Sequence, residues 1–158
     1  MPEPVLATPR ISHIGIAVSD LARSSKFYRD GFGFVDGVQV QVVNEHNALF
    51  GIEGSIEMQS RFLRLKDTII ELVEFSIPSA VISPAMRPLF HTGLTHLSFR
   101  VEDVQVMASH LERLGGKRQL DTITKDTNGG RSGQIIFCTD PDGTRIELMS
   151  YRPDFDFA

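Results

Sequence analysis

The stretch Gly93–Val104, GLTHLSFRVEDV, decides how this chain is organised. It predicts a β-strand that carries His96 near its start and leads into a helix capped by Asp103. A closely similar stretch, SHIGIAVSDL, occupies Ser12–Leu21 and carries His13 in the corresponding place. One histidine-bearing strand before a capped helix is ordinary, but two of them in one chain indicate a duplicated module.

Fixed spacings support the duplication. Three pairs of identical residues stand 83 positions apart: His13 and His96, Asp20 and Asp103, Gly33 and Gly116. The tripeptide Ile-Glu-Leu occurs at 70–72 and again at 146–148, which is an offset of 76, so the first half carries seven extra residues. Four matching anchors in the same order, with a single insertion between them, indicate two copies of one β-α-β-β-β unit.

The chain therefore divides into two modules of the same expected order. Residues 11–75 form the first, with strands at 11–18, 35–43, 55–65 and 68–75, a helix after Asp20 and a short helix within 44–52. Residues 94–151 form the second, with a helix at 104–114 and strands at 94–101, 118–124, 134–139 and 144–151. Residues 76–93 contain three prolines and are expected to be a linker. The remaining segments are an arm at 1–10, a polar loop at 125–133 and a tail at 152–158.

The expected fold is α+β: two tandem βαβββ modules whose mixed sheets form a cup around one metal site. Such modules can pair within one chain or across a dimer. The linker of eighteen residues, 76–93, favours pairing within the chain, with a homodimer built on the outside.

Composition narrows the partners and the compartment. The net charge is −4 and no Lys/Arg stripe is present, so a nucleic-acid partner is not expected. No apolar run approaches the roughly 20 residues of a membrane span, and the N-terminus lacks the pattern of a secretory signal. Cys138 is the only cysteine and is expected in the core. These features predict a cytoplasmic protein that binds a small molecule.

The two histidines and the two Ile-Glu-Leu glutamates are the candidate ligands of a metal. Alternate side chains of a strand share a face, so His13, Glu71, His96 and Glu147 are each expected among apolar neighbours. A lone polar group there costs several kcal/mol, whereas convergence on one cation satisfies all four. The simpler alternative for each histidine is a hydrogen-bonded core residue. Two imidazoles and two carboxylates suit zinc, nickel, cobalt, manganese or iron(II), and the choice among these stays open.

Four segments carry a resemblance to a known family: HIGIAVSDLARSSKFYRDGFGF, IELVEF, GLTHLSFRVEDV and DPDGTRIEL. They resemble the vicinal oxygen chelate superfamily, which includes glyoxalase I, methylmalonyl-CoA epimerase, extradiol dioxygenases and the fosfomycin and bleomycin resistance proteins. In that family the first and last strands of each module supply the metal ligands. The resemblance implies His13, Glu71, His96 and Glu147 as ligands, a set most like glyoxalase I. Methylmalonyl-CoA epimerases often have glutamine where this chain has Glu71.

The resemblance also implies a reaction. A substrate would chelate the ion through two vicinal oxygens, and Glu147 or Glu71 would move a proton next to a carbonyl, as in a lyase, isomerase or epimerase. An extradiol-type dioxygenase that uses iron(II) is the first alternative. A binding or resistance protein without catalysis is the second. The identity of the substrate stays open.

Several further polar residues have weaker cases. Ser98 and Arg100 share the expected face of His96, and His91 lies just before the second module, so these three are candidate substrate contacts. Glu74 lies in the same predicted strand as Glu71 and is expected to face solvent.

Overall fold

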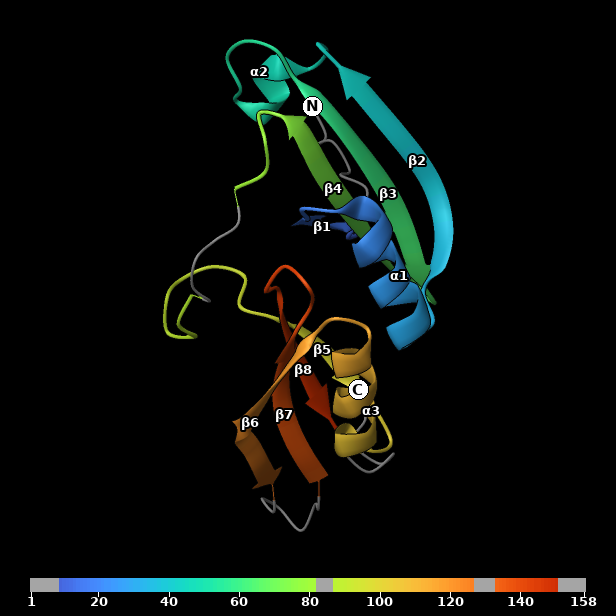
Figure 1. Ribbon diagram of the computed structural model, residues 1–158, viewed down its shortest axis with the longest axis vertical. Helices are drawn as coiled ribbons and strands as arrows, with labels where there is room; N and C mark the ends of the chain where they lie inside the picture. The colour runs from blue at the N-terminus through green and yellow to red at the C-terminus, as the bar shows by residue number, and fades with distance from the viewer. Residues whose placement is uncertain (1–8, 82–86, 127–132, 151–158) are drawn as a thin grey trace, which may run out of the picture.

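The computed structural model describes residues 9–81, 87–126 and 133–150 (Figure 1). Most of the predicted N-terminal arm, the centre of the polar loop at 125–133 and the tail at 152–158 lie outside the described residues. The described residues contain no helix long and apolar enough to cross a membrane.

The first module holds six elements in the predicted order. They are β1 (Ile14–Ala17), α1 (Leu21–Phe32), β2 (Val35–Val43), α2 (Asn47–Phe50), β3 (Glu57–Leu65) and β4 (Thr68–Ile77). The strands form one sheet in the order β1-β4-β3-β2. β1 runs parallel to β4, and the other neighbours are antiparallel, so the sheet is mixed.

The second module repeats this order of strands and main helix in its described residues. Its elements are β5 (Leu97–Arg100), α3 (Val104–Arg113), β6 (Lys117–Asp126), β7 (Gly133–Thr139) and β8 (Arg145–Met149). Its sheet has the matching order β5-β8-β7-β6, and β5 runs parallel to β8. The α+β class and the two tandem modules are thus confirmed.

The helix boundaries follow from local chemistry that the sequence carries. The Asp20 side chain accepts a hydrogen bond from the backbone N–H of Arg23, which caps α1. Gly33 ends this helix with φ of 79°, a left-handed conformation that glycine adopts without steric cost. Asp103 caps α3 in the same way, through Gln105 and Val106.

Some predicted boundaries were wrong. β1 and β5 begin one residue after His13 and His96, so both histidines precede their strands instead of lying within them. β4 continues to Ile77, two residues into the segment expected as linker. The short helix expected within 44–52 is a single turn, α2, which ends at Phe50 because Gly51 adopts the left-handed conformation that closes it.

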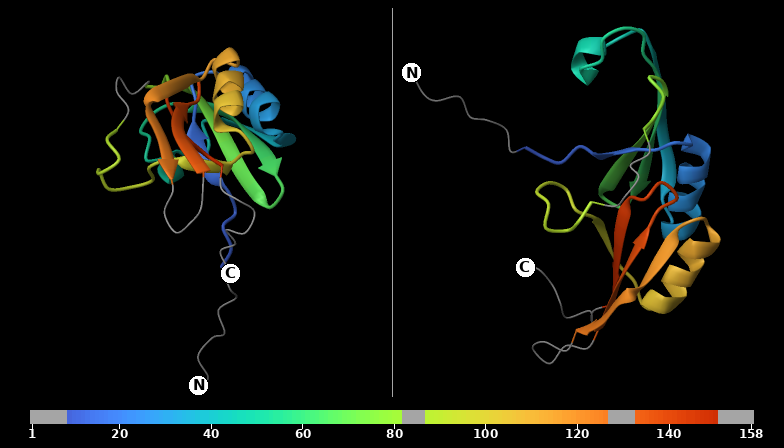
Figure 2. Two further views of the ribbon diagram at one scale, coloured as in Figure 1. Left: turned by 90° about the horizontal axis from the view of Figure 1, so that it is seen from below. Right: turned by 60° about the vertical axis from the view of Figure 1, so that its left-hand side comes forward.

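Helices α1 and α3 cover the same side of the molecule, and each sheet presents its other face away from them (Figures 1 and 2). A single apolar core runs through both modules on the helix side. It includes Phe27, Leu72, Leu111, Ile136 and Ile146, each almost completely buried. Cys138 belongs to this core, as predicted, and burial raises the pKa of its thiol to about 11.

The turn at 140–143 fastens the second module to α1. The carboxylate of Asp140 is buried and accepts a hydrogen bond from the Tyr28 hydroxyl at 3.0 Å. The carboxylate of Asp142 accepts from the Ser19 hydroxyl and from Arg23. Packing of α1 against α3 adds to these contacts. The helix side and this turn therefore fix how the two modules sit in one chain.

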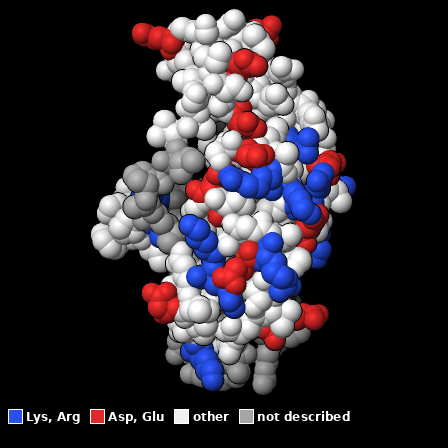
Figure 3. Space-filling model, viewed as in Figure 1, with Lys and Arg blue, Asp and Glu red and all other residues white. Residues whose placement is uncertain are grey.

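The charged side chains over α1 and α3 are mixed in sign. On the face drawn in Figure 3, basic and acidic side chains are interspersed over α1 and α3. Lys26 pairs with Asp30 within α1, and Arg118 of β6 pairs with Glu112 of α3. This face therefore offers no continuous basic surface of the kind that binds nucleic acid.

Candidate metal centre

The first candidate ligand pair lies at the start of β1 and in the middle of β4. The Nε2 atom of His13 is 3.2 Å from Oε2 of Glu71. The pairing of β1 with β4 sets Gly15 opposite Glu71, which brings the end of β1 beside that carboxylate. The Glu71 side chain is 19% exposed and that of His13 36%, so the carboxylate is largely withdrawn from water while the imidazole remains accessible.

The second candidate pair repeats this geometry in the other module. Nε2 of His96 is 3.6 Å from Oε2 of Glu147, and both side chains are less than one-third exposed. The two modules therefore repeat the contact between histidine and glutamate as well as the sequence positions of these residues.

A hydroxyl group lies behind each imidazole. Ser12 Oγ is 3.1 Å from Nδ1 of His13, and Thr95 Oγ1 is 2.9 Å from Nδ1 of His96. In the tautomer that carries its proton on Nδ1, each ring donates to this hydroxyl and keeps the lone pair of Nε2 directed at the glutamate. Ring orientation fixed by a partner of the second nitrogen is typical of metal-binding histidines.

An aromatic ring supports each imidazole from the side. Phe62 meets the ring of His13 edge-on at 5.2 Å between centroids, and Phe137 meets that of His96 at 5.6 Å. Phe62 is the cross-strand partner of Glu71, and Phe137 is that of Glu147. Each imidazole–carboxylate pair is thus accompanied by the same two further groups, a hydroxyl and a phenyl ring.

These supporting residues were not among the candidates predicted from the sequence. Ser12 and Thr95 stand at the constant offset of 83, so a hydroxyl before each histidine was a signal that the repeat could have supplied. Phe62 and Phe137 are 75 positions apart, which matches neither offset. Only the strand register shows that these two phenylalanines correspond.

The second pair has an additional hydrogen bond that the first pair lacks a side chain to make. The Ser98 hydroxyl donates to Oε2 of Glu147 at 2.7 Å, whereas the corresponding position in the first module is Gly15. Ser98, expected as a substrate contact, is therefore engaged with one of the candidate ligands. Arg100 lies further along β5 with an exposed side chain, and His91 packs edge-on against Phe90 in the linker.

Glu74 corrects an expectation of solvent exposure. Its Oε2 accepts a hydrogen bond from the backbone N–H of Leu21 at 2.8 Å, and the side chain is partly buried. The carboxylate thus satisfies a free N–H at the start of α1, where negative charge is favourable. Neighbouring glutamates in β4 therefore have different roles: Glu74 faces the helix and Glu71 faces His13.

The two candidate pairs lie apart within one chain; each supplies half of the expected four-ligand site and is called a half-site below. The pairs belong to different sheets, and the described residues bring no three His, Cys, Asp or Glu side chains together in a metal-binding arrangement. The expectation that the two modules of one chain close around a single ion is therefore not met in this structure. The linker length, on which that expectation relied, allows either arrangement.

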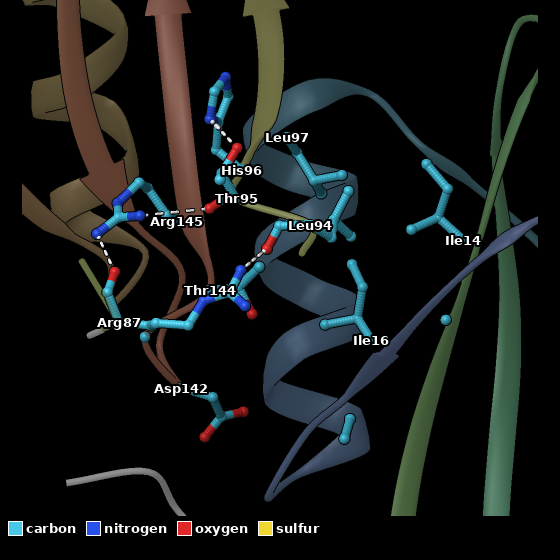
Figure 4. Close-up of a pocket in the computed structure, with 13 residues that line it drawn as sticks. Ile14, Ile16, Arg87, Leu94, Thr95, His96, Leu97, Asp142, Thr144 and Arg145 are labelled. Atoms are coloured by element: carbon cyan, nitrogen blue, oxygen red, sulfur yellow. Dashed lines mark hydrogen bonds between the residues drawn. The ribbon is translucent and has the colours of Figure 1, made fainter. Parts of the chain in front are cut away.

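A cavity of about 520 Å³ separates the edge of β1 from the segment that carries His96 (Figure 4). Ile14 and Ile16 line one side and Leu94 and Leu97 the other. Figure 4 also shows Arg145 donating to the backbone carbonyl oxygens of Arg87 and Thr95.

The guanidinium of Arg87 makes similar contacts with the backbone. It donates to the carbonyl of Thr92 at 2.6 Å and to that of Leu94. Arg87 and Arg145 therefore hold the backbone that positions His96, a role that the sequence did not reveal.

Comparison with known proteins agrees with this architecture. Residues 10–148 match the family described as the Glyoxalase/Bleomycin resistance protein/Dioxygenase superfamily. An uncharacterized protein of Escherichia coli strain K12, YaeR, is 32% identical over 91% of this chain and 98% of its own length. The lactoylglutathione lyase of Schizosaccharomyces pombe is 28% identical over 92% of this chain, which spans about half (48%) of that enzyme.

A solved structure shares the whole fold. The glyoxalase family protein APC24694 from Bacillus cereus superposes with a TM-score of 0.77 and 20% identity, covering 95% of this chain and 99% of that protein. Together with the duplicated βαβββ modules, the match over residues 10–148 shows that the chain belongs to the glyoxalase/bleomycin resistance protein/dioxygenase superfamily.

Proposed function

We propose that this chain forms a divalent-metal enzyme of the glyoxalase type, which chelates a small substrate through vicinal oxygens and transfers a proton next to a carbonyl. The observation that carries the proposal is the repeated constellation of a hydroxyl-bound imidazole facing a carboxylate at His13–Glu71 and His96–Glu147. The lyase named among the relatives supports the reaction class.

The donor atoms fit a metal ion. Two ligands each about 2.1 Å from an ion lie roughly 3.0 to 3.4 Å apart at octahedral or tetrahedral angles. The Nε2–Oε2 separations of 3.2 and 3.6 Å are close to this range. A neutral Nε2 lone pair facing a carboxylate is unfavourable unless a cation lies between them, and a metal ion supplies that charge. The set of two nitrogens and two oxygens suits zinc, nickel, cobalt, manganese or iron(II).

A second copy of the chain would complete each centre. β1 and β5 are edge strands, each with one strand partner among the described residues. Exposed apolar side chains lie beside both of these edges, Ile11 shortly before β1 and Leu94 shortly before β5. Unpaired edges and exposed apolar surface favour association. In a homodimer, His13 and Glu71 of one chain would meet His96 and Glu147 of the other.

The proposed chemistry assigns each side chain a role. The bound ion would act as a Lewis acid on the chelated oxygens. His13 and His96 hold the ion in place, with Ser12 and Thr95 orienting their rings. Glu71 or Glu147 accepts the proton as the C–H bond next to the carbonyl breaks, and then returns that proton to the substrate. Phe62 and Phe137 narrow the access of water to the carboxylates.

Replacing each glutamate by glutamine tests the proton transfer. We expect wild-type protein loaded with nickel, cobalt or manganese to exchange the proton next to the carbonyl of a 2-hydroxy thioester with an uncharged alkyl thiol for deuterium in D₂O under nitrogen. Loss of the proton-accepting carboxylate in Glu71→Gln or Glu147→Gln is expected to slow exchange at least about 100-fold in one variant, while part of the metal remains bound. NMR measures exchange, and the exposed Glu45→Gln is the control.

Three results would contradict this function. Full exchange in both glutamine variants would remove the proposed base. Oxygen consumption that requires iron(II), with no exchange under nitrogen, would instead identify a dioxygenase. A protein that binds its ligand unchanged after all four ligand positions become alanine would be a sequestering protein without catalysis.

A further inference from the structure

A second cavity of about 490 Å³ lies beyond the first half-site, along β1 and β4. Alternate residues of β4 share a face, so Val73 and Phe75 follow Glu71 on the side away from the helices. Ala17 pairs with Val73, just as Gly15 pairs with Glu71. Ala17, Val73 and Phe75 line the cavity, which therefore begins one strand repeat, or about 7 Å, from the candidate ligand.

Residues beyond the sheet also line the cavity: linker residues 78–81, residues 142–144 of the turn, and Ile52 from the interval in which the first module is longer. Ile52, directly after α2, lines the cavity, and Phe50 of α2 packs edge-on against Phe75 at 5.9 Å. Figure 1 shows α2 at the end of β4 where the linker begins. The first module exceeds the second by seven residues between Gly33 and Ile70, the interval that contains α2. The insertion therefore helps to build this cavity.

The described residues that line the cavity include no cationic side chain that could pair with an anion. Asp142 is the one charged residue among the described residues that line it. Its carboxylate already accepts hydrogen bonds from Arg23 at 2.6 Å, from the Ser19 hydroxyl at 2.5 Å and from the Ser19 backbone N–H. Partial burial acts to raise the pKa of Asp142, but the bonds from Ser19 and the charge of Arg23 hold it below the usual value. A charged ligand group would lose its hydration here without compensation.

The repeat shows that this apolar lining is specific to the first module. At the offset of 83, Ala17 corresponds to Arg100, and at the offset of 76, Val73 corresponds to Met149. The small side chains that open the cavity are therefore a feature of one module and not of the common βαβββ architecture.

We propose that this cavity binds an uncharged alkyl or aryl substituent of the substrate, while the vicinal oxygens of the same molecule occupy the metal centre. This inference rests on the proposed metal centre and adds the substrate class. The spacing of about 7 Å places the substituent a few bonds from the chelating oxygens. Its removal from water would supply binding energy at about 0.8 kcal/mol per methylene group.

Hydroxamates test the cavity because they chelate a metal through two vicinal oxygens and carry tails of any chosen kind. Isothermal titration of the full-length, manganese-loaded protein would compare acetohydroxamate, hexanohydroxamate and the monohydroxamate of adipic acid, which ends in a carboxylate. We expect hexanohydroxamate to bind at least about tenfold tighter than acetohydroxamate. The terminal carboxylate should remove most of that gain.

A variant in which a larger side chain fills the cavity tests the same assignment. Ala17 is exposed on the open face, so Ala17→Phe adds a ring to the cavity without entering the core. This variant should bind acetohydroxamate as the wild type does but lose the tenfold preference for the longer tail. Ala22→Phe, the same change at an exposed alanine of α1 outside the cavity, should keep that preference.

The outcomes separate the two proposals. Tight acetohydroxamate binding with no effect of tail length, or equal binding of the carboxylate-ended tail, would overturn the cavity assignment and leave the metal centre standing. No metal-dependent acetohydroxamate binding at all would overturn the metal centre, and with it this inference.

Discussion

Replacing His13 by alanine is expected to lower the affinity for a divalent metal at least about 100-fold, and His96→Ala is expected to do the same. Each substitution removes one of two nitrogen donors and leaves a largely buried carboxylate without its partner. Metal content after dialysis, measured by mass spectrometry, should fall from one ion per chain to less than about one-tenth of that value. The exposed His46, replaced in the same way, should leave metal content unchanged.

Removal of the hydroxyl groups that contact Nδ1 of the two histidines should have a smaller effect on metal binding. Ser12→Ala and Thr95→Val remove the partner of Nδ1 without removing a ligand, so metal affinity should fall by only about 10-fold to 100-fold. Retention of wild-type metal content in both His13→Ala and His96→Ala would show that these histidines are ordinary core residues, the simpler alternative that the sequence left open.

Replacing Asp140 by alanine is expected to destabilise the fold by about 3 kcal/mol, because three donors lose their acceptor. The carboxylate accepts from the Tyr28 hydroxyl and from the backbone N–H groups of Asp142 and Thr144. Burial raises the pKa of Asp140, against the lowering effect of these hydrogen bonds. For a chain of this size the melting temperature should fall by about 6 to 12 °C, as followed by circular dichroism.

Two comparison variants show whether the loss comes from this network. Tyr28→Phe deletes a single hydrogen bond and should cost only about 1 kcal/mol. Asp67→Ala, at an exposed position in the β3–β4 turn, should have almost no effect. An Asp140→Ala protein with the wild-type melting temperature would mean that the turn does not fasten the second module to α1.

Much of the fold could be predicted because its signals are local. An aspartate directly before a helical apolar pattern predicts an N-cap, as Asp20 and Asp103 do for α1 and α3. Gly33 supplies the left-handed residue that ends α1. The Lys66-Asp67 turn fixed the register of β3 and β4, which in turn set Phe62 opposite Glu71. The constant offset between His13 and His96 then related the two modules.

The remaining features depend on contacts between distant segments. Glu74 differs from Glu71 by facing α1, and the alternation of the strand alone does not say which carboxylate a helix start will bind. The Arg145 contacts with the backbone near Thr95 join segments 50 residues apart. Likewise, linker length does not decide whether two modules close on each other or on a second chain, since both arrangements use the same βαβββ units.

The central claim, that two copies of the chain complete each metal centre, is tested most directly by a mixed dimer. His13→Ala and His96→Ala chains with different affinity tags would be co-expressed, and the dimer that carries both tags purified. Across a dimer, the intact first module of the His96→Ala chain meets the intact second module of the His13→Ala chain. We predict one tightly bound ion per mixed dimer, against two in the wild type and none in either single variant. A mixed dimer that binds no metal would contradict the account, because sites closed within each chain would all lack a histidine.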